Sequence, residues 1–278
     1  MAIFLGLCVA LGFGSGDFVG GLASRRAPTL AVLAAVQATA VAIALTLVLL
    51  TDAEVTGRDL GFGALAGTGA VVGLGLLYHG LATGRMGIVA PITAVIASSI
   101  PVAWGISTGE EPSALSLVGV ACAVGAGGLI ARERDLPADG GRVGRDVVLA
   151  LGAGVAFGLS FVAYAETGDD SGFWPLLAAR GTALPLALVA VAVTRTSLRL
   201  PRRELRFAVG AGAFDVSATA LLLVAVREGL ASLVAPVAAL GPAFTVALAW
   251  LVLSEPIAKW QRAGLVLALV GLVLIAAG

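Results

Sequence analysis

The stretch VREGLASLVAPVAALGPAFTVALAWLVLSEPIAKWQRAG, residues 226–264, decides the fold, because a diverged copy of it lies upstream at residues 81–119. A constant shift of 145 positions aligns the copies, although only seven of the 39 pairs are identical. A turn glycine, an Ala-Pro pair early in a helix, a helix-terminal acid and a packing glycine recur in the same order. The pairs are Gly84 with Gly229, Ala90-Pro91 with Ala235-Pro236, Glu110 with Glu255, and Gly119 with Gly264. The chain is therefore predicted to consist of two related halves.

The beginnings of the halves also match, at a shift of 144 positions. Phe13-Gly14 falls on Phe157-Gly158, and Ala34-Ala35 falls on Ala178-Ala179. One residue is therefore gained between the two aligned regions of the second half.

The composition indicates a polytopic helical membrane protein. Of 278 residues, 59% are hydrophobic and 12% are charged, whereas a soluble domain carries about a quarter charged residues. The formal net charge is zero, so nothing in the composition favours a nucleic-acid partner. Cys8 and Cys122 lie inside apolar runs without metal-ligand spacing, so we expect neither a metal nor a cofactor.

Ten segments are long and apolar enough to span a bilayer of roughly 30 Å as helices. The first is expected to be a retained span rather than a signal peptide, because no basic residues precede it. The segments are residues 2–22, 28–51, 59–82, 86–107, 113–131, 146–166, 172–194, 205–226, 231–253 and 257–277.

Five spans per half is an odd number, so the halves are predicted to have opposite orientations in the membrane. The predicted fold is all-α, with two inverted five-helix repeats at 1–131 and 146–278. Residues 132–145, a charged and glycine-rich stretch, form the predicted linker on the cytoplasmic side.

The basic residues of the short loops predict the orientation. Fourteen lysines and arginines fall on one side, and only Arg58 and Arg227 fall on the other, where the loops are acidic. The basic loops and the linker should therefore be cytoplasmic, and both termini should face outward. The arginine-rich, alanine-rich composition is typical of a GC-rich bacterial gene, which places the protein in a bacterial inner membrane.

Polar residues inside the spans are the candidate site, because a charge at bilayer depth costs roughly 2.5–3.5 kcal/mol and usually faces a partner or a cavity. Arg180 and Asp215 could pair with each other or face a substrate. Asp17, Asp215 and His79 are candidates for proton coupling, since they are among the few titratable groups within spans. Further candidate cavity residues, each of which could equally be a helix–helix contact, are Gln37, Tyr78, Ser98, Ser160 and Tyr164.

Prolines interrupt two corresponding helices and predict kinks or hinges beside a solute path. They are Pro91 and Pro101 in the fourth span, and Pro236 and Pro242 in the ninth. Glu110 and Glu255 precede the fifth and tenth spans, where an acid near a helix N-terminus has a structural role.

These residues resemble the EamA-like branch of the drug/metabolite transporter (DMT) superfamily, ten-helix carriers made of two five-helix repeats. The similarity lies in GFGSGDFVGGLASRR (residues 12–26), in the glycine and Ala-Pro unit of each half, and in the helix-starting acids followed by Gly119 and Gly264. The resemblance implies an arginine in the second helix of each repeat. Arg180 matches in the second half, whereas the first half has Val36 followed by Gln37.

The expected function is therefore secondary transport of a small metabolite or drug-like solute, with efflux by alternating access. The partners would be the bilayer and a solute whose anionic or zwitterionic group, such as that of an amino acid, meets Arg180; the protein would be a monomer or a weak homodimer. An uncoupled facilitator remains an alternative. An intramembrane enzyme is a weaker one, because no catalytic motif is present in the sequence.

Overall fold

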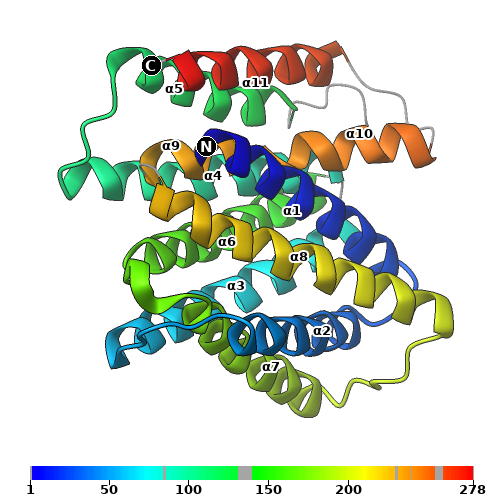
Figure 1. The fold of residues 1–278 in the computed structure, drawn as a ribbon. Coiled ribbons are helices and arrows are strands. Elements are labelled where there is room, and N and C mark those ends of the chain that lie inside the picture. Colours follow the sequence, from blue (N-terminus) through cyan, green and yellow to red (C-terminus); the bar gives the residue numbers. More distant parts are fainter. Residues whose placement is uncertain are drawn as a thin grey trace.

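The computed structural model describes residues 2–83, 86–130, 140–228, 231–238, 240–253 and 259–277. Within these ranges every regular element is a helix, and Figure 1 shows their arrangement. The helices are α1 (Ala2–Ser24), α2 (Thr29–Leu49), α3 (Gly57–Thr83), α4 (Met86–Ser107), α5 (Ala114–Ile130), α6 (Gly140–Ala165), the 3-10 turn η1 (Asp169–Ser171), α7 (Trp174–Val193), α8 (Arg202–Glu228), α9 (Ala231–Ala238), α10 (Gly241–Leu253) and α11 (Lys259–Ala277).

The helices confirm a multi-pass membrane protein. Six of them, α1, α2, α3, α6, α7 and α8, are long and apolar enough to cross a bilayer. The described parts of α4, α5 and α11 contain shorter apolar stretches. Large apolar side chains such as Leu49, Val193 and Leu251 are exposed on the outer surface, as expected for a lipid-facing one.

The two proline-containing segments are built differently. The first is one continuous helix, α4, through Pro91 and Pro101. The second, predicted as one span at 231–253, is divided into α9 and α10, with Leu240 in a turn between them. Gly241 and Pro242 begin α10, where the missing proline N–H costs nothing because first-turn donors have no intrahelical partner. Pro236 lies within α9.

Two predicted boundaries are shifted. Helix α6 begins at Gly140, so the last six residues of the predicted linker are helical, while residues 131–139 lie outside the described chain. Helix α5 begins at Ala114, and its first turn is capped by Ser113, whose hydroxyl accepts from the Ser116 amide at 3.0 Å.

Long-range packing divides the central helices into two groups. Helix α6 packs along α3 and α4, and these three form the α6 group. Helix α1 packs along α8, α9 and α10, and these four form the α1 group, which meets the α6 group where α9 packs on α4. Helix α7 lies chiefly on α3, and α2 contacts both α7 and α8. Helices α5 and α11 pair with each other as a separate layer at the top of Figure 1.

Small residues allow the backbones of these helices to approach closely. A Cβ on Gly67 of α3 would collide with the carbonyl oxygen of Ala179 on α7. A Cβ on Gly212 of α8 would lie 2.6 Å from the carbonyl oxygen of Val36 on α2. Because the obstructing atoms are backbone, these seams cannot accommodate a methyl group without moving a helix.

We therefore expect Gly212→Ala to destabilise the protein by about 1–3 kcal/mol, the usual cost of overpacking. Gly210→Ala is the matched control, since no atom lies within 4 Å of its added Cβ and alanine favours a helix. Melting temperatures of the purified variants in detergent check this. Equal melting temperatures for the two variants would contradict the close α2–α8 seam.

Candidate functional site

A buried ion pair joins α7 to α8. The Arg180 side chain is 2% exposed, and its Nη1 lies 2.8 Å from Oδ2 of Asp215. Arg180 Nη2 donates to the Thr219 hydroxyl at 2.6 Å, and Nη1 donates to the Gln37 side-chain oxygen at 3.4 Å. Thr219 in turn donates to the carbonyl of Asp215, four residues earlier. Thus, of the two alternatives left open by the sequence, Arg180 and Asp215 pair with each other, and Gln37 of α2 joins them.

Several hydrogen-bonding atoms around this pair are not satisfied within the described residues. They are Gln37 Nε2, the Tyr164 hydroxyl and Arg180 Nε, each fully buried. Asp215 Oδ2 is held by the charge contact with Arg180 and forms no hydrogen bond. Because unpaired buried polar groups are costly, this cluster is suited to a partner exchange in which a solute or water supplies the missing contacts.

A central cavity lies between the two helix groups, beside the ion pair. It offers about 70 Å³ to the centres of water-sized molecules, more than the 10–15 Å³ that one water needs. Both helix groups contribute to its wall. The lining residues are Leu74, Leu77, Thr93, Ala94, Ala97, Phe157 and Phe161 from the α6 group, and Phe13, Asp17, Asp215, Ala238 and Gly241 from the α1 group.

The charges around the cavity do not balance. Asp17 and Asp215 both line it, and Arg180 pairs with Asp215. Among the described residues Asp17 has neither an ion pair nor a hydrogen bond, and Gly16 beside it faces the α8 backbone at Ala211 and Asp215. With both carboxylates ionised, the cavity would carry one uncompensated negative charge, which a proton or a cationic group on a solute can neutralise.

The other predicted cavity residues form contacts within the helix array. The Tyr78 hydroxyl lies 3.5 Å from the carbonyl oxygen of Gly16, and Ser160 donates to Ala66 at 2.8 Å across the α3–α6 seam. Ser98 donates to carbonyls of its own helix. His79 contacts the Arg145 guanidinium at 2.7 Å. None of these four lines the central cavity among the described residues.

Of the two glutamates predicted to have a structural role, the structure describes Glu110. Glu110 precedes α5 by four residues and folds beside Gly105, near the end of α4. Glu255 lies outside the described residues. Pro91, Pro101, Pro236 and Pro242 are in helices, and Pro101 is not among the described residues that line the cavity.

Sequence reasoning missed the aromatic part of the cavity. Phe13 and Phe157 line it from α1 and α6, and the Phe13 and Phe161 ring centroids are 6.3 Å apart. A signal was present, because Phe13-Gly14 and Phe157-Gly158 are matched between the halves. The match between the halves predicted a repeat, but it did not by itself indicate that these rings line a cavity.

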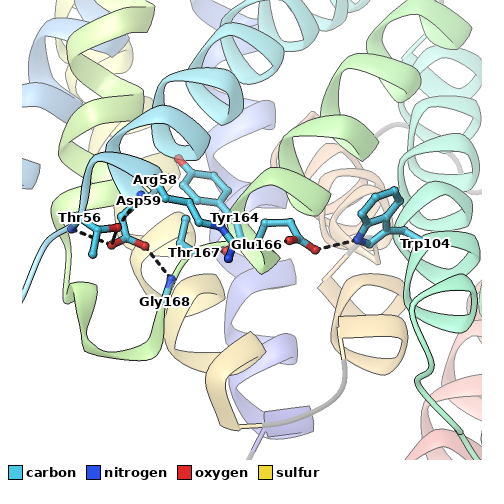
Figure 2. A network of polar contacts seen from close by, with 8 residues as sticks. All are labelled: Thr56, Arg58, Asp59, Trp104, Tyr164, Glu166, Thr167 and Gly168. Carbon is cyan, nitrogen blue, oxygen red and sulfur yellow. Dashed lines mark hydrogen bonds and ion pairs between the residues drawn. The ribbon is translucent and has the colours of Figure 1, made fainter.

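A second polar network lies at one edge of the helix array, where α3 begins and α6 ends (Figure 2). Asp59 accepts from the Thr56 hydroxyl and amide and from the Gly168 amide. The Glu166 carboxylate accepts from Arg58 and from the Trp104 indole, each at 3.0 Å. This is the acidic edge, where both chain ends also lie (Figure 1); the opposite, basic edge carries the loops rich in arginine.

Comparison with known proteins identifies the second half of the chain. The model of the EamA-like transporter family matches residues 145–277. These residues belong to the EamA-like transporter family. The family is part of the DMT superfamily, as the resemblance in the sequence indicated, and the match coincides with the predicted second repeat. EamA proteins are membrane transporters of small solutes.

Two further similarities are less specific. The uncharacterized protein MJ1333.1 of Methanocaldococcus jannaschii is 32% identical over 90 residues, 32% of this chain and 66% of that protein. A protein crystal structure is similar with a TM-score of 0.70 and 15% identity, over 97% of this chain and 96% of that one. At this identity the likeness concerns the fold alone.

Removing one member of the Arg180–Asp215 pair should destabilise the protein by about 3–5 kcal/mol, because the remaining charge is buried without a partner. We expect Arg180→Met and Asp215→Asn each to lower the melting temperature, and the double variant to lower it by less than the sum. Arg58→Gln is the control, since the Arg58 side chain is 66% exposed and such pairs contribute about 0–1 kcal/mol. Strict additivity of the two single changes would contradict the coupling.

Proposed function

We propose that this EamA protein is a secondary transporter that exports a small solute across the bacterial inner membrane by alternating access. The central cavity carries the proposal, because helices of both groups form its wall and because it contains unbalanced charge. A solute at such a site can be exposed to either side in turn when the two groups tilt against each other.

The proposal includes the inverted repeat. Ser160 contacts the carbonyl of Ala66. The corresponding residues of the other half are Gly16 and Ala211, and a Cβ added to Gly16 would lie 3.3 Å from the Ala211 carbonyl oxygen. Gly69 packs against Ala156, and their counterparts Phe214 and Gly12 also meet. Corresponding helices α3 and α8 run in opposite directions across Figure 1. These paired contacts are those expected when a two-fold axis in the membrane plane relates the halves.

The moving units of this mechanism are not the repeats themselves. The α6 group contains α3 and α4 of the first half, and the α1 group contains α8, α9 and α10 of the second. The α6 group thus joins the first helix of the second half to two helices of the first half. The α1 group joins the first helix of the first half to three helical segments of the second half. We therefore propose movement between two mixed groups rather than movement of one repeat against the other.

The charges of the cavity suggest which part of the solute it recognises. Asp17 and Asp215 face the cavity, whereas Arg180 is fully buried behind Asp215. An ammonium group would neutralise the excess charge, and the phenylalanine rings would accept an apolar body or stack on a cation. An amino acid or another amine-bearing metabolite fits, and its carboxylate would reach Arg180 if Asp215 released the guanidinium.

Proton coupling would use the same carboxylates. Asp17 and Asp215 can each hold a proton or face a cation, so proton and solute would compete for one site. His79 contacts Arg145 away from the cavity, which makes it the weaker of the three candidates. An uncoupled facilitator would leave the carboxylates ionised throughout, and an enzyme would convert its solute.

We further propose cytoplasmic basic loops, outward termini, and a monomer or weak homodimer.

Transport assays on the protein in proteoliposomes test the proposed proton coupling and the proposed solute together. Labelled amino acids, nucleosides and cationic drugs are screened for counterflow in proteoliposomes, and a hit is then measured under a pH gradient. We expect the gradient to drive accumulation, and Asp17→Asn to abolish that drive while counterflow continues. His79→Gln should retain coupling. Accumulation indifferent to the gradient would support the facilitator, and chemical conversion of the solute would support an enzyme.

A further inference from the structure

The C-terminal end of α8 is attached to the turn after α6 by one arginine. Arg227 Nη2 lies 2.9 Å from the Ser171 hydroxyl, 2.9 Å from the Gly172 carbonyl oxygen and 3.3 Å from the Gly168 carbonyl oxygen. We call these four residues the Arg227 clamp. We propose that the Arg227 clamp holds the carrier closed at its acidic edge, an inference that rests on the proposed transport function.

The clamp crosses between the two helix groups. Arg227 belongs to α8 of the α1 group, whereas its acceptors directly follow α6 of the α6 group. The neighbouring contacts of Glu166 with Arg58 and Trp104 join α6 to α3 and α4, and so remain inside one group. Two arginines at the same edge therefore have different consequences: one braces a group, and the other joins two groups that must separate.

The acceptors are held in position by other contacts, so Arg227 meets a prepared surface. The Gly168 amide donates to Asp59 of α3 at 2.7 Å, and the Ser171 hydroxyl donates to the Gly168 carbonyl at 2.6 Å. Gly172 has φ +54°, a conformation that favours glycine. In this conformation its carbonyl oxygen accepts a hydrogen bond from Arg227. The nearby carboxylates of Asp169, Asp59 and Asp170 add attraction for the guanidinium.

The clamp lies at the acidic edge, beyond the central cavity along α8 and α6. Arg227 is twelve residues beyond Asp215 on α8, about 18 Å along the helix at 1.5 Å per residue. Gly168 is seven residues beyond Phe161, which lines the cavity from α6. A solute leaving the cavity toward this edge must pass where α8 and the turn after α6 are joined.

The direct hydrogen-bond acceptors of Arg227 are suited to release, whereas the attraction of the nearby carboxylates Asp169, Asp59 and Asp170 opposes it. The direct acceptors are two backbone carbonyls and a hydroxyl, none of which carries a full charge. When α8 moves away, these neutral acceptors can be hydrated at the surface more easily than a deeply buried ion pair such as Arg180–Asp215. The other edge is closed differently, by the buried Tyr78 ring of α3 against Gly16 and Gly20 of α1.

A thiol-accessibility experiment tests the clamp without knowledge of the solute. Cys8 and Cys122 are replaced by alanine, and Ala94→Cys supplies a reporter in the cavity wall. Membrane-impermeant maleimide is applied to each face of sealed vesicles, and the exposed sites Asp52→Cys and Arg199→Cys identify the acidic and basic faces. Arg227→Gln is compared with Arg58→Gln, the matched arginine whose ion pair lies within one group.

We expect Arg227→Gln to increase labelling of Ala94→Cys from the acidic face about tenfold. That change corresponds to a loss of about 1.4 kcal/mol in the free-energy difference that favours the closed state. Labelling from the basic face should not rise, Arg58→Gln should change neither face, and Arg227→Lys should restore part of the protection. Ser171→Ala removes one acceptor and should give a smaller increase. It provides the same test if Arg227→Gln fails to fold.

Equal effects of Arg227→Gln and Arg58→Gln, or an increase from both faces, would overturn the clamp. If Ala94→Cys is reached from the basic face but no clamp variant alters acidic-face labelling, the clamp is wrong and the carrier proposal stands. If the reporter is reached from neither face in any variant, the transport proposal itself fails.

Discussion

The placement of two carboxylates and one guanidinium inside an apolar helix array is the constraint on which the structure depends. Lipid offers these groups no hydration, so each must find a protein partner, a proton or a solute. Arg180 satisfies most of its requirement through Asp215, Thr219 and Gln37. Asp17 does not, and it lines the cavity. The imbalance makes the centre of this protein a site of binding and exchange rather than only of packing.

Small residues make that arrangement possible. Glycines at the α3–α7, α3–α6 and α2–α8 seams bring the backbones of neighbouring helices into contact, which supports close helix packing. Charged side chains join different elements at two depths: Arg180 acts near the centre, and Arg227 acts at the acidic edge.

Much of this arrangement could be predicted from individual residues. Long apolar runs predicted the helices, and the charges of Arg180 and Asp215 within those runs predicted that each residue would either pair or face a substrate, because neither can remain unpartnered at that depth. The division of the ninth span into α9 and α10 was not predicted, although Gly241-Pro242 is a recognisable helix start. A proline can kink a helix or begin a new one, and which occurs depends on the neighbours that hydrogen-bond the freed carbonyls.

The sequence by itself determined the membrane environment, the helical class, the family of the second half and the unusual residues within the spans. These follow from local hydropathy and from residue types that lipid penalises. Only the tertiary structure decided that helices of both halves mix in each packed group, that Phe13, Phe157 and Phe161 surround the cavity, and that Arg227 reaches the turn after α6. These relations join residues tens to more than two hundred positions apart, and they depend on which helix faces meet, for which hydropathy carries no information when every face is apolar.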